Sequence, residues 1–361
     1  MATTILIIVL SVAAGLVLLY LAFGAFMFGQ TLSRKAAGRG MNTLSDEDVL
    51  LGKEGAMQKR REQQTAFERL VDRIAGDASG LGDFYDKPYF PSFLAGLQWF
   101  FANHPQKVTT GSPRGMRLHA DVFLHEKTPS NVWFVCIHGY SSSPRDFGGL
   151  AKVVHEDWGC NVLLPYLGAH GRSEGKHISM GWLDRLDIVA WTEYLVREHG
   201  EDVKIVLLGN SMGAATTMMT TGETLPPNVV CAVADCGYTS FWDEYVVQAK
   251  VILGLPPFPG VYALNTMVKW RMGFSMKEAS SVEQLKKSKT PTLFIHGDAD
   301  AFVPFWMQDL VYEACAAEKQ KLAVPGAGHS ESHYQEELYY GTVKEFVGRY
   351  LPGFARETVA R

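Results

Sequence analysis

A serine flanked by glycines is the residue of this sequence best suited to nucleophilic chemistry. Ser211 stands at the centre of GNSMG, positions 209–213, which matches the G-x-S-x-G pattern of a nucleophile elbow. In such a strand-to-helix turn the serine is exposed, and the glycines avoid clashes between Cβ atoms and nearby backbone. The largely apolar run VKIVLL precedes the pentapeptide and the small-residue run MGAATTMMTT overlaps its end. The pattern therefore predicts a strand, a tight turn and a helix, with Ser211 as nucleophile.

A serine hydroxyl needs a general base, and the base needs an acid that orients it. His329 follows the apolar run at 320–324, and Asp300 follows the run at 292–297. His329 would take the proton of Ser211 and later deliver it to the leaving group, while Asp300 would hold the imidazole tautomer. The order Ser, Asp, His along the chain is the one typical of this kind of elbow.

Other side chains compete for the acid and base roles. Asp235 ends an earlier apolar run and occupies an alternative acid position, whereas Asp298 is better placed to shape a turn. His333 is the rival of His329. We favour Asp300 and His329, because each lies just past the C-terminal end of a predicted strand, where the sites of sheets flanked by helices gather, whereas His333 lies within the following segment.

The negative charge of a tetrahedral intermediate needs backbone N–H donors. The N–H of Met212, directly after the nucleophile, is one expected donor, and the N–H of Tyr140 in the turn HGY is the other. The histidines His138, His170 and His296 are expected to be structural hydrogen-bonding residues that support loops.

Apolar runs and amphipathic segments alternate from about residue 108 onwards. Strands are expected at 117–124, 132–137, 161–164, 203–208, 229–234, 292–295 and 320–324, and helices at 147–156, 182–198, from 212, and at 336–350. This alternation predicts an α/β fold with a doubly wound, mostly parallel sheet. Such a sheet would bring the three catalytic candidates to one edge.

The alternation breaks between about 238 and 288, where two helices are expected, at 242–253 and 260–272. We interpret this aromatic and proline-rich insertion as a small helical lid. Its aromatic side chains either line an apolar substrate pocket or pack against the core; they are Phe241, Trp242, Phe258 and Tyr262.

The first 33 residues carry no charged side chain, and 5–28 form an apolar run long enough to span a bilayer as a helix. A cleaved signal peptide is the competing interpretation, which the length of the run and the missing basic start argue against. Arg34, Lys35 and Arg39 follow the span, so the positive-inside rule predicts a single-pass membrane protein with a cytoplasmic catalytic domain.

The predicted organisation has three parts. Residues 1–33 form the transmembrane anchor, 34–100 a juxtamembrane helix (about 45–74) with an aromatic connector, and 101–361 the catalytic domain. A net charge of −4 without a basic stripe argues against a nucleic-acid partner. The five cysteines show no metal-ligand spacing and are expected to be buried thiols, although a Cys231–Cys236 disulfide stays open.

Taken together, these motifs resemble the α/β-hydrolase superfamily, in particular membrane-anchored bacterial serine hydrolases of the serine aminopeptidase-like and monoacylglycerol-lipase-like group. The resemblance covers about 100–352 and rests on IHGYSSSP, LGAHGRSEG, GWLDRLDIVAW, LGNSMGAAT, ADCGYTSFWDE, LFIHGDADAFVP and VPGAGH. It implies acyl-enzyme hydrolysis without metal or cofactor, with Ser211, Asp300 and His329 as the triad. The loop LGAHGRSEG departs from the more common Arg-Gly-His-Gly, which puts arginine-dependent contacts there in doubt.

Three functions follow as hypotheses. The leading one is hydrolysis of carboxylic esters with small to medium lipophilic acyl groups. A peptidase or amidase on the same triad is the second, and would need an acidic cluster in the lid to receive an amine; Asp243 and Glu244 are the only close pair there. The third is a non-catalytic lipid- or protein-binding protein, which an intact triad argues against.

Overall fold

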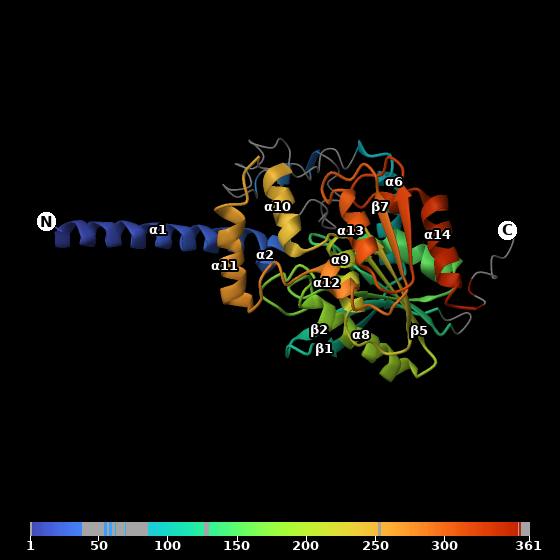
Figure 1. The fold of residues 1–361 in the computed structure, drawn as a ribbon. Coiled ribbons are helices and arrows are strands. Elements are labelled where there is room, and N and C mark those ends of the chain that lie inside the picture. The colour runs from blue at the N-terminus through green and yellow to red at the C-terminus, as the bar shows by residue number, and fades with distance from the viewer. Residues whose placement is uncertain are drawn as a thin grey trace.

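The computed structural model describes residues 2–37, 86–125, 130–251, 254–352 and 354, together with six isolated positions between 38 and 85. Figure 1 shows one long helix, α1 (Ala2–Thr31), projecting from a body built around a twisted sheet. A short helix, α2 (Arg34–Ala37), follows it. The helix predicted for 45–74 lies outside the described residues apart from those isolated positions, so it stays a prediction.

The sheet of the described residues has eight strands in the order β1-β2-β4-β3-β5-β6-β7-β8. β1 and β2 pair antiparallel, β2 also pairs antiparallel with β4, and the remaining pairs are parallel. This confirms the predicted mostly parallel sheet. The bounds are β1 (Gln106–Gly111), β2 (Arg117–Phe123), β3 (Val132–Ile137), β4 (Asn161–Pro165), β5 (Lys204–Asn210), β6 (Val229–Asp235), β7 (Thr292–Gly297) and β8 (Lys319–Val324).

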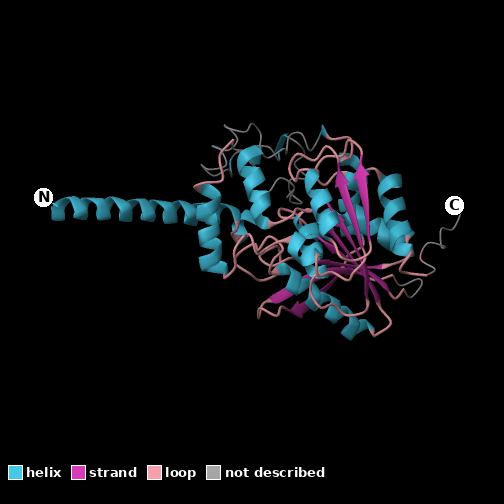
Figure 2. Ribbon diagram, viewed as in Figure 1, coloured by secondary structure: helices cyan, strands magenta, loops and turns pink. Residues whose placement is uncertain are grey.

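Helices cover both faces of this sheet (Figure 2). Side chains of β3 alternate between the two faces, with Trp133 and Val135 in one apolar cluster and Phe134 and Cys136 in the other. The first cluster includes α8 (Asp184–His199), α9 (Met212–Thr221), α12 (Ser281–Leu285) and α13 (Trp306–Ala314). The second includes α6 (Phe90–Ala102), α7 (Gly148–Lys152) and α14 (Glu336–Gly348). Burial on both faces explains why the central strands are continuous apolar runs.

The aromatic connector packs on the body through close helix contact. A Cβ atom on Gly148 would lie 2.1 Å from the carbonyl oxygen of Gly96, so only glycines let α6 and α7 approach this closely. The helix predicted at 147–156 is in fact three short segments: a 3-10 turn (Pro144–Phe147), α7, and a π-helical turn (Val153–Asp157). The two adjacent glycines, Gly148 and Gly149, make one continuous helix unfavourable there.

The insertion between β6 and β7 contains α10 (Phe241–Val251) and α11 (Gly260–Met272), close to the two predicted lid helices. α11 runs across the C-terminal part of α1 where that helix meets the body (Figure 1). A Cβ atom on Gly24 would lie 2.6 Å from the carbonyl oxygen of Ala263, so the two helices are in backbone contact. The lid is therefore attached to the N-terminal helix as well as to the sheet.

α1 has two different halves. Its N-terminal part is exposed and apolar, from Ile5 to Leu19, and Thr4–Thr31 is long and apolar enough to cross a membrane. Its C-terminal end and the residue after it belong to the core, because Phe28 and Leu32 have no exposed surface. The Arg34 guanidinium then donates to the carbonyl oxygen of Ser173 at 2.6 Å. The apolar helix is thus both a candidate span and a part of the folded body.

Phe28→Ala is expected to lower the free energy of unfolding of the full chain by about 3–5 kcal/mol, because it leaves a cavity between α1 and the lid. Leu16→Ala truncates an apolar side chain at an exposed position of the same helix and is the matched control. It should leave the free energy of unfolding unchanged. Denaturant unfolding in detergent micelles, followed by near-UV circular dichroism, measures both. Equal effects of the two variants would show that the end of α1 adds nothing to the core.

Candidate active site

Ser211 occupies a strained turn between β5 and α9. Its φ is +56° and its ψ −120°, a conformation rarely adopted by a residue with a side chain. A Cβ atom on Gly209 would lie 2.1 Å from the carbonyl oxygen of Gly213, and one on Gly213 would lie 1.9 Å from that of Ile137. Both glycines of the pentapeptide are therefore required by backbone contacts, which is the nucleophile-elbow geometry that the sequence predicts.

The structure brings the three predicted triad side chains together. His329 Nε2 lies 2.8 Å from Ser211 Oγ, and His329 Nδ1 lies 2.7 Å from Asp300 Oδ2. These atoms come from three loops that follow β5, β7 and β8 at the carboxyl edge of the sheet. A nucleophile, a base and an orienting acid at hydrogen-bond distance form the arrangement needed for proton transfer from the serine.

Asp300 is held as a carboxylate by four donors. Its Oδ1 accepts from the N–H groups of Phe302 and Val303, both at 2.9 Å, and its Oδ2 faces His329 and, at 3.3 Å, His296 Nε2. Burial raises the pKa of this carboxyl, but the hydrogen bonds from His296 and His329 outweigh it and bring the pKa to about 2. The acid is thus ionised at neutral pH, as an orienting partner of an imidazole must be.

The rival residues are occupied elsewhere. Asp298 Oδ1 accepts from Gly326 N–H at 2.6 Å and so shapes a turn. Asp235 is a buried neighbour of Asn210, and burial raises its pKa to about 6. The His333 ring lies 4.0 Å from the Tyr334 ring, and burial lowers its pKa to about 4. In the structure, then, neither Asp235 nor Asp298 is hydrogen-bonded to His329.

The HGY turn lies against the nucleophile. A Cβ atom on Gly139 would be 3.8 Å from Ser211 Oγ, so the missing side chain leaves the backbone next to the hydroxyl. His170 Nε2 hydrogen-bonds the carbonyl oxygen of Tyr140 at 2.7 Å, and His138 Nε2 accepts from Leu167 N–H at 3.1 Å. Burial, together with the His170 charge, lowers the pKa of His138 to about 3, so this ring is neutral. Both histidines support loops, as expected from the sequence.

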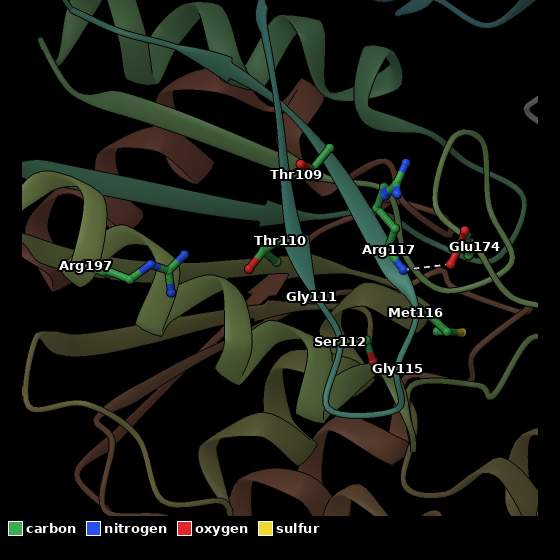
Figure 3. Close-up of a pocket in the computed structure, with 9 residues that line it drawn as sticks. All are labelled: Thr109, Thr110, Gly111, Ser112, Gly115, Met116, Arg117, Glu174 and Arg197. Carbon is green, nitrogen blue, oxygen red and sulfur yellow. Dashed lines mark hydrogen bonds between the residues drawn. The ribbon is translucent and has the colours of Figure 1, made fainter.

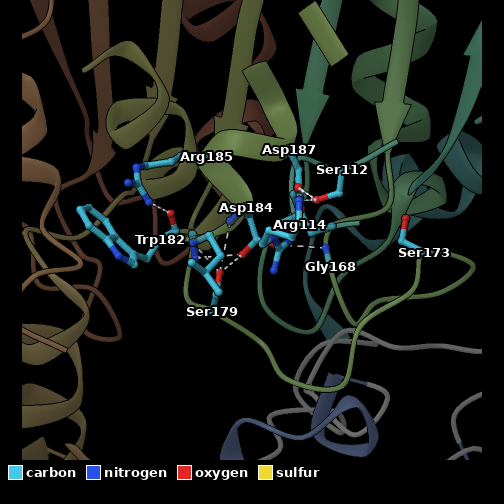
Figure 4. A network of polar contacts seen from close by, with 12 residues as sticks. Ser112, Arg114, Gly168, Ser173, Ser179, Trp182, Asp184, Arg185 and Asp187 are labelled. Carbon is cyan, nitrogen blue, oxygen red and sulfur yellow. Dashed lines mark hydrogen bonds and ion pairs between the residues drawn. The ribbon is translucent and has the colours of Figure 1, made fainter. Parts of the chain in front are cut away.

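A network of polar side chains fixes the loop that carries LGAHGRSEG (Figure 4). Asp184 accepts from Gly168 N–H at 3.1 Å with one oxygen and from the Ser179 hydroxyl at 2.5 Å with the other. The Arg114 guanidinium pairs with Asp187 and lies 3.9 Å from Asp184. Because His170 belongs to this loop, the network also positions the Tyr140 turn.

The arginine of the unusual loop does not point to the triad. Arg172 pairs with Asp121 of β2, and its guanidinium lies 4.7 Å from the centre of the Tyr166 ring. The departure from Arg-Gly-His-Gly left open which contacts an arginine makes in this loop. In the structure Arg172 stabilises the loop from the side of β2.

The comparisons with known proteins agree with this geometry. Residues 134–339 match the family model described as "Alpha/beta hydrolase family", more than half of the chain. The chain belongs to the alpha/beta hydrolase family. Among curated proteins it is 27% identical to the uncharacterized protein YqkD of Bacillus subtilis, over 58% of this chain and 75% of that protein. It is 24% identical to the alpha/beta hydrolase domain-containing protein WAV2 of Arabidopsis thaliana, over 77% and 92%.

Solved structures, among them that of an esterase, share the fold. The Pyrococcus furiosus esterase Pf2001 aligns with a TM-score of 0.56 at 22% identity, covering 70% of this chain and 93% of that one. Est1E from Butyrivibrio proteoclasticus, bound to ferulic acid, aligns with a TM-score of 0.54 at 18% identity, covering 68% and 99%. Family membership and this fold support hydrolase activity on a small-molecule substrate.

The four candidate aromatic side chains of the lid of this alpha/beta hydrolase differ in burial. Phe241 is fully buried in the core, and Trp242 packs edge-on against Tyr262 with ring centroids 5.0 Å apart. Phe258 and Tyr262 lie on the outer surface. Phe241 therefore packs in the core, one of the two alternatives left open by the sequence, while a substrate-contacting role for Trp242, Phe258 and Tyr262 stays a prediction.

The acidic pair of the lid is also divided. Asp243 accepts hydrogen bonds from the Thr239 and Ser240 hydroxyls at 2.8 and 2.7 Å at the start of α10. Glu244 is only 3% exposed, and Gln248 Nε2 donates to its Oε1 at 2.7 Å. Burial raises the pKa of Glu244 to about 8, so this carboxyl is mainly neutral at pH 7. An interior carboxyl of this kind was not predicted from the sequence, where the two residues were only an adjacent acidic pair.

Glu244→Gln is expected to raise the free energy of unfolding at pH 8 by on the order of 4 kcal/mol and to have little effect at pH 4. The folded carboxyl binds its proton more tightly than the unfolded one. The wild type therefore loses stability as the pH rises from about 4.3, the unfolded pKa, to about 8, the folded one. Denaturant melts at several pH values measure this slope, and Asp243→Asn is the control that should keep it. If the unfolding free energy of Glu244→Gln depended on pH as steeply as that of the wild type, the raised pKa of Glu244 would be contradicted.

A pocket at the antiparallel edge of the sheet contains none of the triad residues (Figure 3). It lies over β1 and β2, and Arg117 N–H donates to Glu174 Oε2 at its rim, 2.8 Å apart. Its lining is polar: Thr109, Thr110, Gly111, Ser112, Gly115, Met116, Arg117, Glu174 and Arg197. None of these residues belongs to the triad.

The described residues bring one possible metal-ligand group together, and it overlaps the triad. Ligand atoms of Cys236, Asp300 and His329 lie within 4.8 Å of one another. Burial raises the pKa of the Cys236 thiol well above its usual value, and a thiol that stays protonated is a poor ligand. The residues therefore fit proton transfer better than metal binding. Cys231 and Cys236 are both free thiols, so the disulfide left open by the sequence is not formed.

Proposed function

We propose that this alpha/beta hydrolase is a serine hydrolase that cleaves carboxylic esters of small to medium lipophilic acyl groups. The observation that carries the proposal is the position of His329, with one ring nitrogen 2.8 Å from Ser211 Oγ and the other 2.7 Å from a buried carboxylate. The solved structures that share this fold include the Pyrococcus furiosus esterase Pf2001, which favours esters as the substrate class.

The proposed reaction has two halves. His329 Nε2 takes the hydroxyl proton of Ser211 while Oγ attacks the ester carbonyl carbon, and the tetrahedral oxyanion is stabilised by the N–H groups of Met212 and Tyr140. Collapse breaks the bond to the alcohol, which leaves with the proton from His329. A water molecule then attacks the acyl-enzyme in the same way, releasing the acid and restoring Ser211.

The buried carboxyl of the lid argues against amine recognition. A substrate amine is attracted by an ionised acid, whereas Glu244 is held mainly neutral and Asp243 is used to begin α10. Peptidase or amidase activity therefore has no separate support in the lid, and we retain it as an outcome of the test.

The full chain in detergent micelles should hydrolyse p-nitrophenyl esters from acetate to decanoate, and should hydrolyse the matching p-nitroanilides far more slowly. Ser211→Ala provides the baseline. No ester turnover above that baseline would refute the proposal, and faster anilide than ester cleavage would replace it with the amidase function.

We also propose that α1 is a retained, single-pass membrane anchor. The burial of Phe28 and Leu32 and the hydrogen bonds of Arg34 support a helix that stays attached to the body. The basic residues after the span favour a cytoplasmic body. A membrane-impermeant fluorophosphonate should then label Ser211 in lysed cells only; labelling in intact cells would reverse the orientation.

A further inference from the structure

The lid carries a row of large apolar side chains with no partner on their outer side. Phe258 and Trp270 are 64% and 76% exposed, and Leu255 and Tyr262 are 54% and 46% exposed. Tyr262, Thr266 and Trp270 recur every four residues and so lie along one side of α11. Phe258, just before the helix, packs against the Tyr262 ring with ring centroids 5.8 Å apart. The opposite side is buried against the body through Val261, Leu264, Met267 and Val268. We call the exposed row, with Leu255, the outer face of α11.

The contact with α1 shows which way this face points. Gly24 meets Ala263, while Tyr20, one turn closer to the N-terminus, hydrogen-bonds Thr266 through its hydroxyl at 3.3 Å. Thr266 belongs to the outer face, so that face is turned towards the exposed half of α1. Figure 1 shows α11 lying across α1 at the point where the long helix leaves the body.

The length of α1 places this crossing at the edge of a bilayer. A hydrocarbon core of about 30 Å requires about 20 helical residues at about 1.5 Å each. Counted from Thr4, the start of the apolar span, that distance ends near Phe23 and Gly24, where α11 crosses. A helix lying across the span at this depth is in the headgroup region.

The chemistry of the outer face suits that region. Tryptophan and tyrosine are enriched at the interface because their rings are amphipathic. Lys250, Lys269 and Lys277 are exposed next to the face, and basic side chains on an amphipathic helix are attracted to anionic headgroups.

We propose that the outer face of α11 is a membrane-contact surface, which holds the lid in the headgroup layer of the bilayer that α1 spans. The inference rests on the proposed anchor, and adds that the lid itself touches lipid. A partner protein or a second copy of the chain on this face would be the competing occupants.

The test uses the full chain in vesicles of phosphatidylcholine and phosphatidylglycerol. Tyr262→Cys and Trp270→Cys are each labelled with an environment-sensitive fluorophore; the five native cysteines are buried, and unmodified protein gives the labelling background. Leu338→Cys on α14, an exposed apolar position on a helix far from α1 in Figure 1, is the matched control. Lipids with a nitroxide near the glycerol should quench the two lid probes about twofold or more, and the control little.

Three results would overturn the inference. In the first, the protein resists alkaline extraction from the vesicles, but the lid probes are quenched no more than the control. This result would leave the anchor intact and refute lipid contact. Lid probes shielded from both the lipid quencher and an aqueous one would indicate a protein occupant. Protein extracted by alkaline carbonate would refute the anchor, and the membrane-contact surface with it.

Discussion

Ser211→Ala is expected to lower kcat for ester hydrolysis by about 10⁴–10⁶-fold, because the variant has no hydroxyl for His329 to deprotonate. The turn is already adopted by a residue with a Cβ atom at φ +56°, so alanine adds no new clash and the fold should be retained. Steady-state hydrolysis of the preferred p-nitrophenyl ester in micelles measures the loss. Any residual rate would come from water attack assisted by the backbone donors.

Ser92→Ala is the matched control for this variant. Ser92 is an exposed serine of α6, outside the triad and its supporting loops, so its removal should leave both kcat and fluorophosphonate labelling unchanged. Labelling of Ser211→Ala at the wild-type rate would show that a different side chain is the nucleophile.

Asp300→Asn is expected to reduce kcat by about 10⁴-fold while leaving Ser211 and His329 in place. An asparagine amide in place of the carboxylate donates to Nδ1 and so puts the imidazole proton on Nε2, where it blocks acceptance of the serine proton. The loss should appear in kcat more than in KM, since no substrate contact is removed. Single-turnover rates of acylation measure it directly.

The same substitution also tests the electrostatics of the acid. The pKa of Asp300 is about 2 in the fold and near 3.9 in an unfolded chain, so the folded state binds fewer protons between these values. The stabilisation from the carboxylate is therefore complete above about pH 4 and is lost as the pH falls towards 2. Kinetics should be compared well below the melting temperature of the less stable variant.

Asp235→Asn is the matched comparison, since Asp235 is also buried, lies at the end of the neighbouring strand β6, and was the rival acid. Its side chain contacts Asn210 and not the imidazole, so kcat should stay within about tenfold of the wild type. A larger loss in Asp235→Asn than in Asp300→Asn would reverse the assignment of the acid.

Much of the fold was predictable because its signals are local. The central strands are buried on both faces, so each is a continuous apolar run such as VWFVCI, and the elbow is recognisable from adjacent residues. β1 gave a weak signal, since QKVTTG is an exposed edge strand without an apolar pattern. The break at 147–157 was missed because the need for glycine at 148 comes from the close approach of Gly96 of α6, which is distant in the sequence.

The sequence alone determined the chemical types, their order and the strands that precede them, since these depend only on neighbouring residues and the periodicity of burial. Tertiary structure decided which carboxylate meets His329, because Asp235 at the end of β6 and Asp298 and Asp300 after β7 all lie near the same sheet edge, and only their partners from other segments distinguish them. It also decided that Glu244 is neutral and that Phe28 belongs to the core. Burial and pKa depend on segments far apart in the chain, and no local pattern encodes which of them will pack together.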